Sequence, residues 1–372
     1  MNPRTQFCHN PQCPARGQVG QGNIRVHSHT EQRYRCTSCG QTFTATKGTP
    51  FYRLRTAAEL VTVVLTLLSH GCPLQAIVAA FGVDERTVAT WLLRAGQHGQ
   101  QVHQHVVQQA QVDLPHVQAD ELWVKLVGRR IWMAMAMAVP SRRWLGGVIS
   151  AQRDLPLITT LVQLIRSCAR TLAILVCADG LASYVTAVLR VFRQPVYTGR
   201  RGRPRLVLGQ GLLLGQVVKR YARRRVVGVE QRVVRGTKKA LAAVLATTHT
   251  GTGINTAYIE RLHATFRASL APLVRRGRAI AHTETVLTAG MWLVGCVYNC
   301  CRRHDSLRVA APAGACWQWQ ERTPAMAAGL TTHRWTMPEL LRYQVPLPPW
   351  VAPKRRGRPP KRVLQLEMAV AA

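Results

Sequence analysis

Hydrophobic residues alternate with small or polar ones along a stretch in the middle of the chain. Between residues 131 and 139 every second side chain is large and apolar, and three alanines and one tryptophan fill the places between them. This period of two is typical of a strand buried on both faces. Further apolar stretches at 117–123 and 144–149 flank it, with a basic turn at Arg129-Arg130. The pattern predicts a three-stranded antiparallel meander.

The segment after the meander changes from strand-like to helical periodicity and back. Residues 155–169 form an amphipathic pattern, 172–178 are continuously apolar, and 183–192 are helical again. A continuous apolar run is typical of a strand buried on both faces. Asp179 follows this strand directly, at the end where open α/β sheets bind ligands, although it also suits a helix N-cap. The fold class predicted is therefore α/β.

Residues 57–97 predict a helix-turn-helix domain. After an apolar helical stripe, a short helix at 73–81 precedes the turn Gly82-Val83-Asp84 and a second helix from Glu85, which Asp84 would cap. Such a second helix enters the major groove of DNA, although any helical hairpin gives a similar pattern. The DNA contacts predicted on it are Arg86, Thr87, Thr90 and Arg94. Residues 98–112, rich in Gln and His, predict a linker helix.

Four cysteines near the N-terminus have the spacing of metal ligands. They form one C-x4-C pair and one C-x2-C pair about twenty residues apart: Cys8, Cys13, Cys36 and Cys39. We predict a structural Zn²⁺ bound by these thiolates in a zinc ribbon over residues 1–50, with His9 as an alternative ligand. The remaining seven cysteines show no second ligand set.

Composition points to a polyanionic partner. The 372 residues, enough for two or three domains, include 50 Lys plus Arg against 16 Asp plus Glu, a formal net charge of +34. Neutralising phosphates releases counterions, so double-stranded DNA is the partner we expect, ahead of a merely basic protein or a membrane surface. Without a run of 18 uncharged apolar residues or a signal-peptide core, the expected location is cytoplasmic and associated with the nucleoid.

Two segments concentrate the positive charge. Residues 199–239 hold thirteen Lys or Arg and a single acid, which predicts contact with the DNA backbone through Arg201 and Arg203, or else a solvated basic insertion. Residues 311–372 form a Trp- and Pro-rich region expected to pack on the α/β domain before it or on a second protomer. Its basic end is similar to an AT-hook, which inserts arginines into a narrow minor groove. The contacts predicted there are Arg356, Gly357 and Arg358.

Another acid, Glu260, lies on a predicted helix near residues 255–267, with Asn255 as its N-cap. Ile259, Leu262 and Phe266 would lie on one face of this helix, and the other face presents Glu260, His263 and Arg267. Glu260 is thus a presented carboxylate, unless it only pairs with His263 on a solvated face. Arg267 is a further predicted DNA contact.

Few acids compete for a catalytic role between residues 100 and 300. Most lie at linkers, helix starts or in the basic segment, and Glu121 alternates to the face opposite Asp120. Asp120, Asp179 and Glu260 remain. Asp120 lies among apolar neighbours, where a charge is costly without a cation. Mg²⁺ prefers carboxylate oxygens, and two such ions about 4 Å apart support in-line phosphodiester chemistry.

These motifs resemble the DDE transposases of bacterial insertion sequences. The likeness rests on a zinc ribbon before a helix-turn-helix, and on residues 120–123, 178–180, 255–261, 298–307 and 323–325. It implies a ribonuclease-H-like mixed-sheet catalytic domain at 113–310, with the basic segment inserted, in which the three acids hold Mg²⁺ or Mn²⁺. It also implies that the N-terminal domains bind terminal inverted repeats, and that the chain cleaves DNA and transfers strands as a homo-oligomer.

Two other functions fit parts of the pattern. A non-catalytic DNA-binding regulator would use the same ribbon, helix-turn-helix and hook, but would have no need of three acids in suitable contexts. A divalent-metal DNA nuclease would use the acids but not a domain for recognising two matching ends. The interval of 80 residues between Asp179 and Glu260 is longer than is common in the superfamily, which the basic segment accounts for.

Overall fold

The computed structural model describes residues 1–197, 199, 202–223, 225–274, 277, 279–311 and 317–352. These divide into two compact units. The first joins Met1–Lys47 to the described residues from Pro346 onward, and the second is Gly48–Val345. Within the described ranges, no helix combines the length and the apolar character needed to span a membrane.

A six-stranded mixed sheet forms the centre of the second unit, in the order β11-β10-β7-β4-β5-β6. Its strands are β4 (His116–Leu126), β5 (Arg129–Ala138), β6 (Arg143–Ser150), β7 (Leu175–Asp179), β10 (Leu213–Ala222) and β11 (Arg225–Arg235). The predicted meander is confirmed as the antiparallel strands β4, β5 and β6. β7 pairs in parallel with both β4 and β10. The α/β class is confirmed, and this order is compatible with a ribonuclease-H-like sheet.

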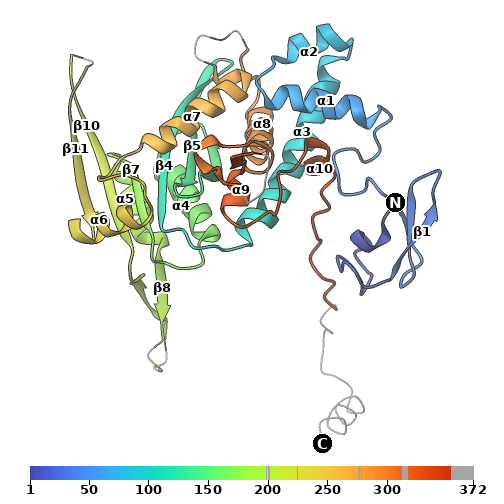
Figure 1. Cartoon of the computed structure of the whole chain (residues 1–372), viewed down its shortest axis with the longest axis horizontal. Coiled ribbons are helices and arrows are strands. Elements are labelled where there is room, and N and C mark those ends of the chain that lie inside the picture. The colour runs from blue at the N-terminus through green and yellow to red at the C-terminus, as the bar shows by residue number, and fades with distance from the viewer. Residues whose placement is uncertain are drawn as a thin grey trace, which may run out of the picture. The chain divides into compact units, whose positions relative to one another are not determined.

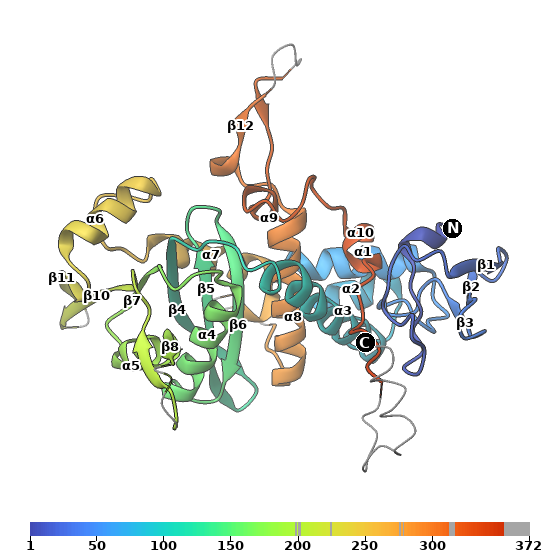
Figure 2. The same cartoon turned by 90° about the horizontal axis from the view of Figure 1, so that it is seen from below.

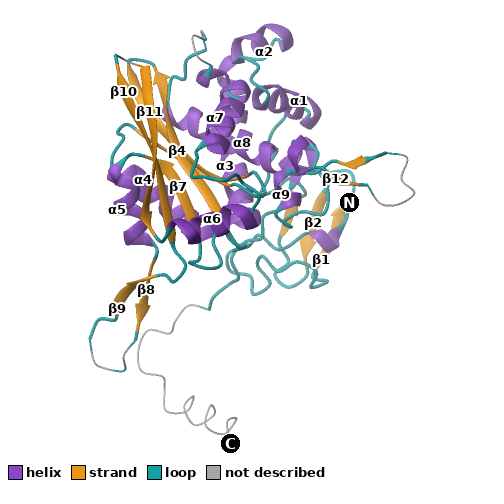
Figure 3. Ribbon diagram, turned by 60° about the vertical axis from the view of Figure 1, so that its left-hand side comes forward, coloured by secondary structure: helices purple, strands orange, loops and turns teal. Residues whose placement is uncertain are grey.

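Helices cover both faces of this sheet (Figures 1 and 3). The helices on one face are α4 (Leu155–Cys168) and α5 (Ala182–Val191), and those on the other are α6 (Lys238–Thr247), α7 (Ala257–Ser269) and α8 (Glu284–Cys296). Alternation along β4 explains the two layers. Val117 and Ala119 belong to the core beneath α4 and α5, whereas Leu122 and Val124 belong to the core beneath α7 and α8.

The helices that precede the sheet share a hydrophobic core with α8. They are α1 (Ala58–Ser69), α2 (Leu74–Phe81) and α3 (Glu85–His103). Gly82 ends α2 with a φ of 62°, and Asp84 caps α3 as predicted. α3 continues into the π-helical turn η2 (Gln104–Gln108), so the predicted boundary between residues 97 and 98 falls inside one continuous helix.

The basic segment at 199–239 is only partly an insertion. β8 (Arg193–Val196) and β9 (Arg205–Leu208) form a separate two-stranded hairpin with mostly exposed residues, which Figure 1 shows projecting from the sheet. β10, in contrast, is a strand of the central sheet, and β11 extends that sheet at its edge. The predicted insertion therefore supplies part of the core.

The C-terminal part of the second unit consists of short elements after α8. They are the π-helical turn η4 (Val297–Cys301), the 3₁₀ turn η5 (Asp305–Leu307), the hairpin β12 (Val309–Ala310) and β13 (Trp319–Gln320), and helices α9 (Pro324–Ala327) and α10 (Met337–Arg342). A further 3₁₀ turn, η3 (Ala271–Leu273), lies earlier, between α7 and α8. Figure 2 shows the hairpin projecting beyond α9. Trp335 packs in the core with α10, whereas Trp317 and Trp319 are exposed. Only part of the predicted Trp-rich packing is thus observed.

The first unit is a small antiparallel sheet with few apolar residues. Its elements are the 3₁₀ turn η1 (Pro3–Thr5) and the strands β1 (Ile24–Ser28), β2 (Arg33–Cys36) and β3 (Thr42–Thr44), in the order β1-β2-β3. Its apolar core is limited to a few aromatic and aliphatic side chains around the buried cysteines. A core of this size is usually reinforced by a metal or a cross-link.

Candidate functional site

The first two predicted acids lie side by side on parallel strands. β4 and β7 pair with Ala119 opposite Ala178. The next residue on each strand is an acid, Asp120 on β4 and Asp179 at the end of β7. β10 continues the sheet, with Val217 opposite Asp179. The sheet itself therefore brings two carboxylates together, which their distance in the sequence does not reveal.

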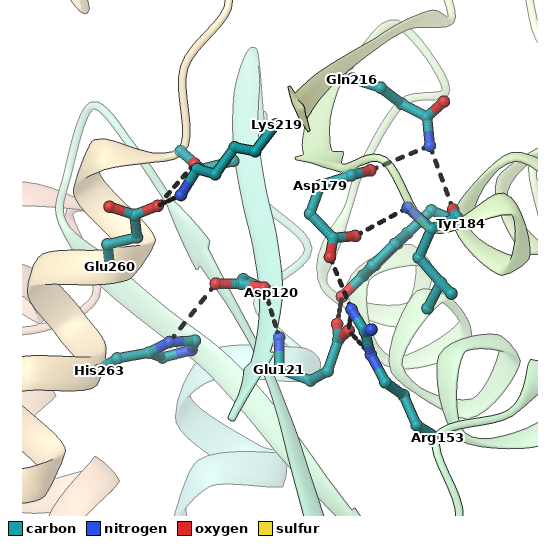
Figure 4. A network of polar contacts seen from close by, with 11 residues as sticks. Asp120, Glu121, Arg153, Asp179, Tyr184, Gln216, Lys219, Glu260 and His263 are labelled. Carbon is teal, nitrogen blue, oxygen red and sulfur yellow. Dashed lines mark hydrogen bonds and ion pairs between the residues drawn. The ribbon is translucent and has the colours of Figure 1, made fainter. Parts of the chain in front are cut away.

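Glu260 lies in the first turn of α7, over the same face of the sheet (Figure 4). The fully buried Gln118 of β4 fixes the start of this helix. Its Oε1 accepts the backbone N–H groups of Tyr258 and Ile259, each at 3.0 Å. Because Gln118 lies two residues before Asp120, one strand positions both its own carboxylate and the helix that carries the third.

The predicted capping residue of α7 was wrong. The N-cap is Thr256, whose side chain caps no backbone group, and the helix begins at Ala257. Asn255 instead accepts the N–H of Ala257 at 3.2 Å, and its backbone carbonyl accepts the Gln118 Nε2 at 2.8 Å. Capping from a neighbouring strand adds to the local contact of Asn255, and a local sequence pattern could not identify the contribution of the strand.

Three carboxylates form a group whose ligand atoms lie within 4.8 Å of one another: Asp120, Glu121 and Asp179. We call this group the carboxylate cluster. Glu121 does point to the opposite face from Asp120, as predicted, because Tyr184 of α5 donates to its Oε2 at 2.8 Å. It nevertheless belongs to the cluster, which the sequence analysis missed. Glu260 lies beside the cluster but outside it.

Two residues that the sequence analysis did not identify hold the cluster in place. Arg153 donates to both Glu121 and Asp179, and its contact with Asp179 Oδ2 is 2.7 Å. Gln216 of β10 donates through Nε2 to the backbone carbonyls of Asp179 and Leu181, at 3.0 and 3.1 Å. Burial and the Asp179 charge raise the pKa of Glu121, so its pairing with Arg153 offsets the cost of a carboxylate that is fully buried.

Lys219 of β10 forms an ion pair with Glu260, the third predicted acid. Its Nζ lies 2.8 Å from Glu260 Oε1, and Thr256 Oγ1 donates to the same oxygen at 3.1 Å. Burial opposes ionisation of Glu260, but the Lys219 ammonium outweighs it and lowers the pKa of this carboxyl. Glu260 is therefore ionised and already paired.

Asp120 carries the unfavourable charge of the site. Burial, followed by the charges of Glu121 and Asp179, raises its pKa to about 7. The His263 Nδ1 lies 3.6 Å from Asp120 Oδ2, but burial lowers the pKa of His263 to about 4, so this ring is neutral. His263 is also only 3% exposed, which excludes the predicted alternative of a solvated pair with Glu260. A buried set of oxygen donors short of positive charge could hold a metal ion.

The four cysteines of the first unit form a second group that could hold a metal, again with ligand atoms within 4.8 Å of one another. Cys8 and Cys39 Sγ are 3.6 Å apart, and Cys13 and Cys36 Sγ are 3.9 Å apart. The group, which we call the cysteine cluster, does not include the alternative ligand His9. The wide C-x4-C spacing is therefore accommodated without a histidine.

The stretch at 298–307, which carries part of the family resemblance, supports the sheet. The side chain of Asn299 accepts the N–H of Trp144 at 2.9 Å and donates to the carbonyl of the same residue at 2.8 Å. Tyr298 donates to the Arg142 carbonyl at 2.9 Å. Both contacts fix the start of β6, so these two side chains have a structural role in this chain.

The predicted DNA contacts on α3 differ in their exposure. Arg86 and Thr90 are exposed and Thr87 is half-buried. Arg94 is half-buried and donates to the Tyr52 carbonyl at 2.8 Å, so it is engaged within the protein. The start of α3 therefore presents exposed polar side chains, whereas Arg94 does not.

Two further residues that were predicted to contact DNA lie within the described part of the chain. Arg203 is exposed in the connection between β8 and β9, and Arg267 is half-buried on α7. The remaining predicted contacts lie outside the described residues: Arg201, Arg356, Gly357 and Arg358.

Comparison with known proteins adds no family to this description. No protein-family model matches the chain, and no curated protein matches its sequence. Inference about its function therefore starts from the geometry of the carboxylate and cysteine clusters.

Proposed function

We propose that the chain is a DDE transposase, which binds the terminal inverted repeats of an insertion sequence and carries out metal-dependent DNA cleavage and strand transfer. One observation carries the proposal. Asp120 and Asp179 end up adjacent on parallel strands, and α7 carries Glu260 over the same face. This arrangement of three acids on a mixed sheet supports a ribonuclease-H-like catalytic domain.

The donor chemistry supports a different metal at each cluster. Hard carboxylate oxygens favour Mg²⁺ or Mn²⁺, and four thiolates favour Zn²⁺. When bound, divalent ions at the carboxylates supply charge that activates an attacking oxygen and stabilises a leaving one. The chain's own residues hold Asp179 through Arg153 and Gln216, and orient α7 through Gln118. Zn²⁺ at four closed ligands has a structural role.

DNA as the partner is supported by charge and by the helix-turn-helix. The net charge of +34 favours phosphate binding, and Arg86 and Thr90 are exposed at the start of α3. A transposase must act at two ends of an element, so we also propose a homo-oligomer on DNA. Monomers alone in a catalytically active DNA complex would contradict this.

A strand-cleavage assay with Mg²⁺ tests the proposal. The substrate is DNA that carries both flanks of the source gene, and the variants are Asp120→Asn, Asp179→Asn and Glu260→Gln. Each variant should lose cleavage by about a hundredfold or more while DNA binding is kept. The matched control is Asp113→Asn, because Asp113 pairs with Arg170 at an exposed position away from the carboxylate cluster.

The outcomes separate the competing functions. Cleavage at the element ends followed by joining to target DNA supports the transposase. Cleavage without preference for the ends supports a nuclease. DNA binding without any cleavage by the parent chain, under conditions where Mg²⁺ is bound, supports a regulator and overturns the proposal.

A further inference from the structure

Within the proposed triad, Glu260 pairs with Lys219, whereas Asp179 pairs with Arg153. Its Oε1 accepts both Lys219 Nζ and Thr256 Oγ1, at 2.8 and 3.1 Å. The carboxylate cluster contains Asp120, Glu121 and Asp179 within 4.8 Å, and Glu260 is not among them. The third acid is therefore held beside the other two without completing the group.

The register of β10 explains how Lys219 reaches this position. Val217 lies opposite Asp179 and belongs to the core on the α6 and α7 face. Side chains two residues apart on a strand share a face, so Lys219 points to the same face as the acids, one step beyond them. Arg220 points away and pairs instead with Glu230 at 2.8 Å.

The two cations at the site differ in how firmly they are held. Arg153 pairs with Glu121, whose side chain has no exposed surface, so removal of Arg153 would leave a buried carboxylate without its cation. Lys219 and Glu260 have side chains that are 41% and 48% exposed. Exposed pairs contribute little to stability and exchange partners readily. Arg153 is therefore a fixed anchor, whereas the pair of Lys219 and Glu260 can open at low cost.

We propose that Lys219 is a positioning residue that keeps Glu260 out of the carboxylate cluster until a divalent cation binds, and that its released ammonium then faces the phosphodiester. The inference rests on the proposed function, because it concerns the same metal site and substrate class. Lys219 holds Glu260 ionised and close by in the metal-free chain. Once the carboxylate turns to the cation, the ammonium can pair with a phosphate oxygen.

Mn²⁺ titration of the zinc-loaded full chain, without DNA, tests this. Lys219→Gln should bind Mn²⁺ about two- to fivefold more tightly than the parent, since an exposed ion pair no longer has to break. Arg220→Gln is the matched control, because it removes a neighbouring cation on the other face and should leave the affinity unchanged. In a Glu260→Gln background, the effect of Lys219→Gln should vanish.

A second readout follows Lys219 itself. Its rate of acetylation by an amine-reactive reagent, measured by mass spectrometry, should rise when Mn²⁺ is added to the parent chain. The rate at Lys238 and Lys239, in the first turn of α6, should not change. A purely structural lysine would show no such response.

The outcomes also separate this inference from the proposed function. A Mn²⁺ site that depends on Asp179 but is unaffected by Lys219→Gln overturns the role of Lys219 and leaves the metal site intact. If Lys219→Gln still tightens Mn²⁺ binding in the Glu260→Gln background, its effect is one of general electrostatics. The proposed role of Lys219 is then overturned as well. Failure to bind Mn²⁺ at all overturns both.

Discussion

Asp120 shows at the scale of one residue why an acid in a hydrophobic sheet points to function. Burial and two neighbouring carboxylates raise its pKa to about 7. The neutral ring of His263 does not supply the missing charge. Because a negative charge is unfavourable among these neighbours, Asp120 is the carboxylate that would gain most from a bound cation.

His103 makes a residue-scale prediction about pH. This ring is buried between Trp144 and Trp292, and burial lowers its pKa from 6.5 to about 3. The folded state therefore holds it neutral while the unfolded chain takes up a proton below about pH 6.5, so stability is lost as the pH falls. His103→Leu should reduce the loss of unfolding free energy between about pH 7.5 and about pH 5 by roughly 2 kcal/mol.

Urea unfolding of the parent and variant at the two pH values measures the effect. His105→Leu, two residues further along and more exposed, serves as the control. An equal loss of stability in the parent and in His103→Leu would contradict the assignment.

At the scale of elements, α7 depends on a strand for its start. The amide of Gln118 satisfies two N–H groups that an isolated helix leaves without partners, and it does so from β4. The position of Glu260 therefore depends on contacts between β4 and a helix that lies more than a hundred residues later in the chain.

Replacement of Gln118 tests this dependence. Gln118→Met keeps the volume but leaves the N–H groups of Tyr258 and Ile259 unsatisfied, and should lower the unfolding free energy by about 2–3 kcal/mol. It should also weaken Mn²⁺ binding, although Gln118 is not a ligand. Gln100→Met, at an exposed site on α3, is the control. Unchanged stability in both variants would refute the capping role.

Helices α3 and α8 approach each other closely at a glycine. A Cβ at Gly96 would lie 2.3 Å from the Ala289 Cα and 2.7 Å from its carbonyl oxygen. Gly96→Ala should therefore destabilise the second unit by about 1–3 kcal/mol, despite the better helix propensity of alanine. Chemical denaturation compares it with Gln97→Ala on the exposed side of the same turn. A more stable Gly96→Ala chain would show that the helices can separate freely.

The elements that local periodicity determines were predictable from the sequence. The meander, the strand before Asp179 and the apolar face of α7 all follow from spacing within a few residues. β10 was read as part of a basic insertion because its apolar start runs into Lys219 and Arg220. The contributions of Arg153 and Gln118 depend on pairing between distant segments, which a single sequence does not record.

At the scale of the whole molecule, the chain stabilises its two units by different means. The second unit buries a sheet between two layers of helices, whereas the first surrounds four free cysteines with a few apolar residues. Negative charge is also distributed unevenly. The acids are few, and four of them, Asp120, Glu121, Asp179 and Glu260, lie close together. We therefore expect the first unit to need a metal in order to fold, and the second unit to need one only for its proposed activity.

Removal of zinc should unfold the first unit and leave the stability of the second unit unchanged. Chelation, or the change Cys13→Ser, should unfold the first unit, since metal binding contributes roughly 10 kcal/mol to such small domains. The second unit should keep its melting transition. Metal content and amide NMR signals of β1 to β3 measure the effect, and Cys72→Ser, outside the cysteine cluster, is the control. A first unit that stays folded without metal would contradict the prediction.

The unbroken course of α3 has a consequence for the DNA that such a protein could use. Its first two turns present Arg86 and Thr90, and its later turns pack on α8 within the same unit. A helix of 19 residues spans about 28 Å, close to eight base pairs of duplex. In the proposed transposase, a continuous helix would fix the distance between the DNA-recognition residues and the catalytic site. If the chain acts as the proposed transposase, the base sequence at the ends of its element should vary more freely than the distance from the contacted bases to the cleaved bond.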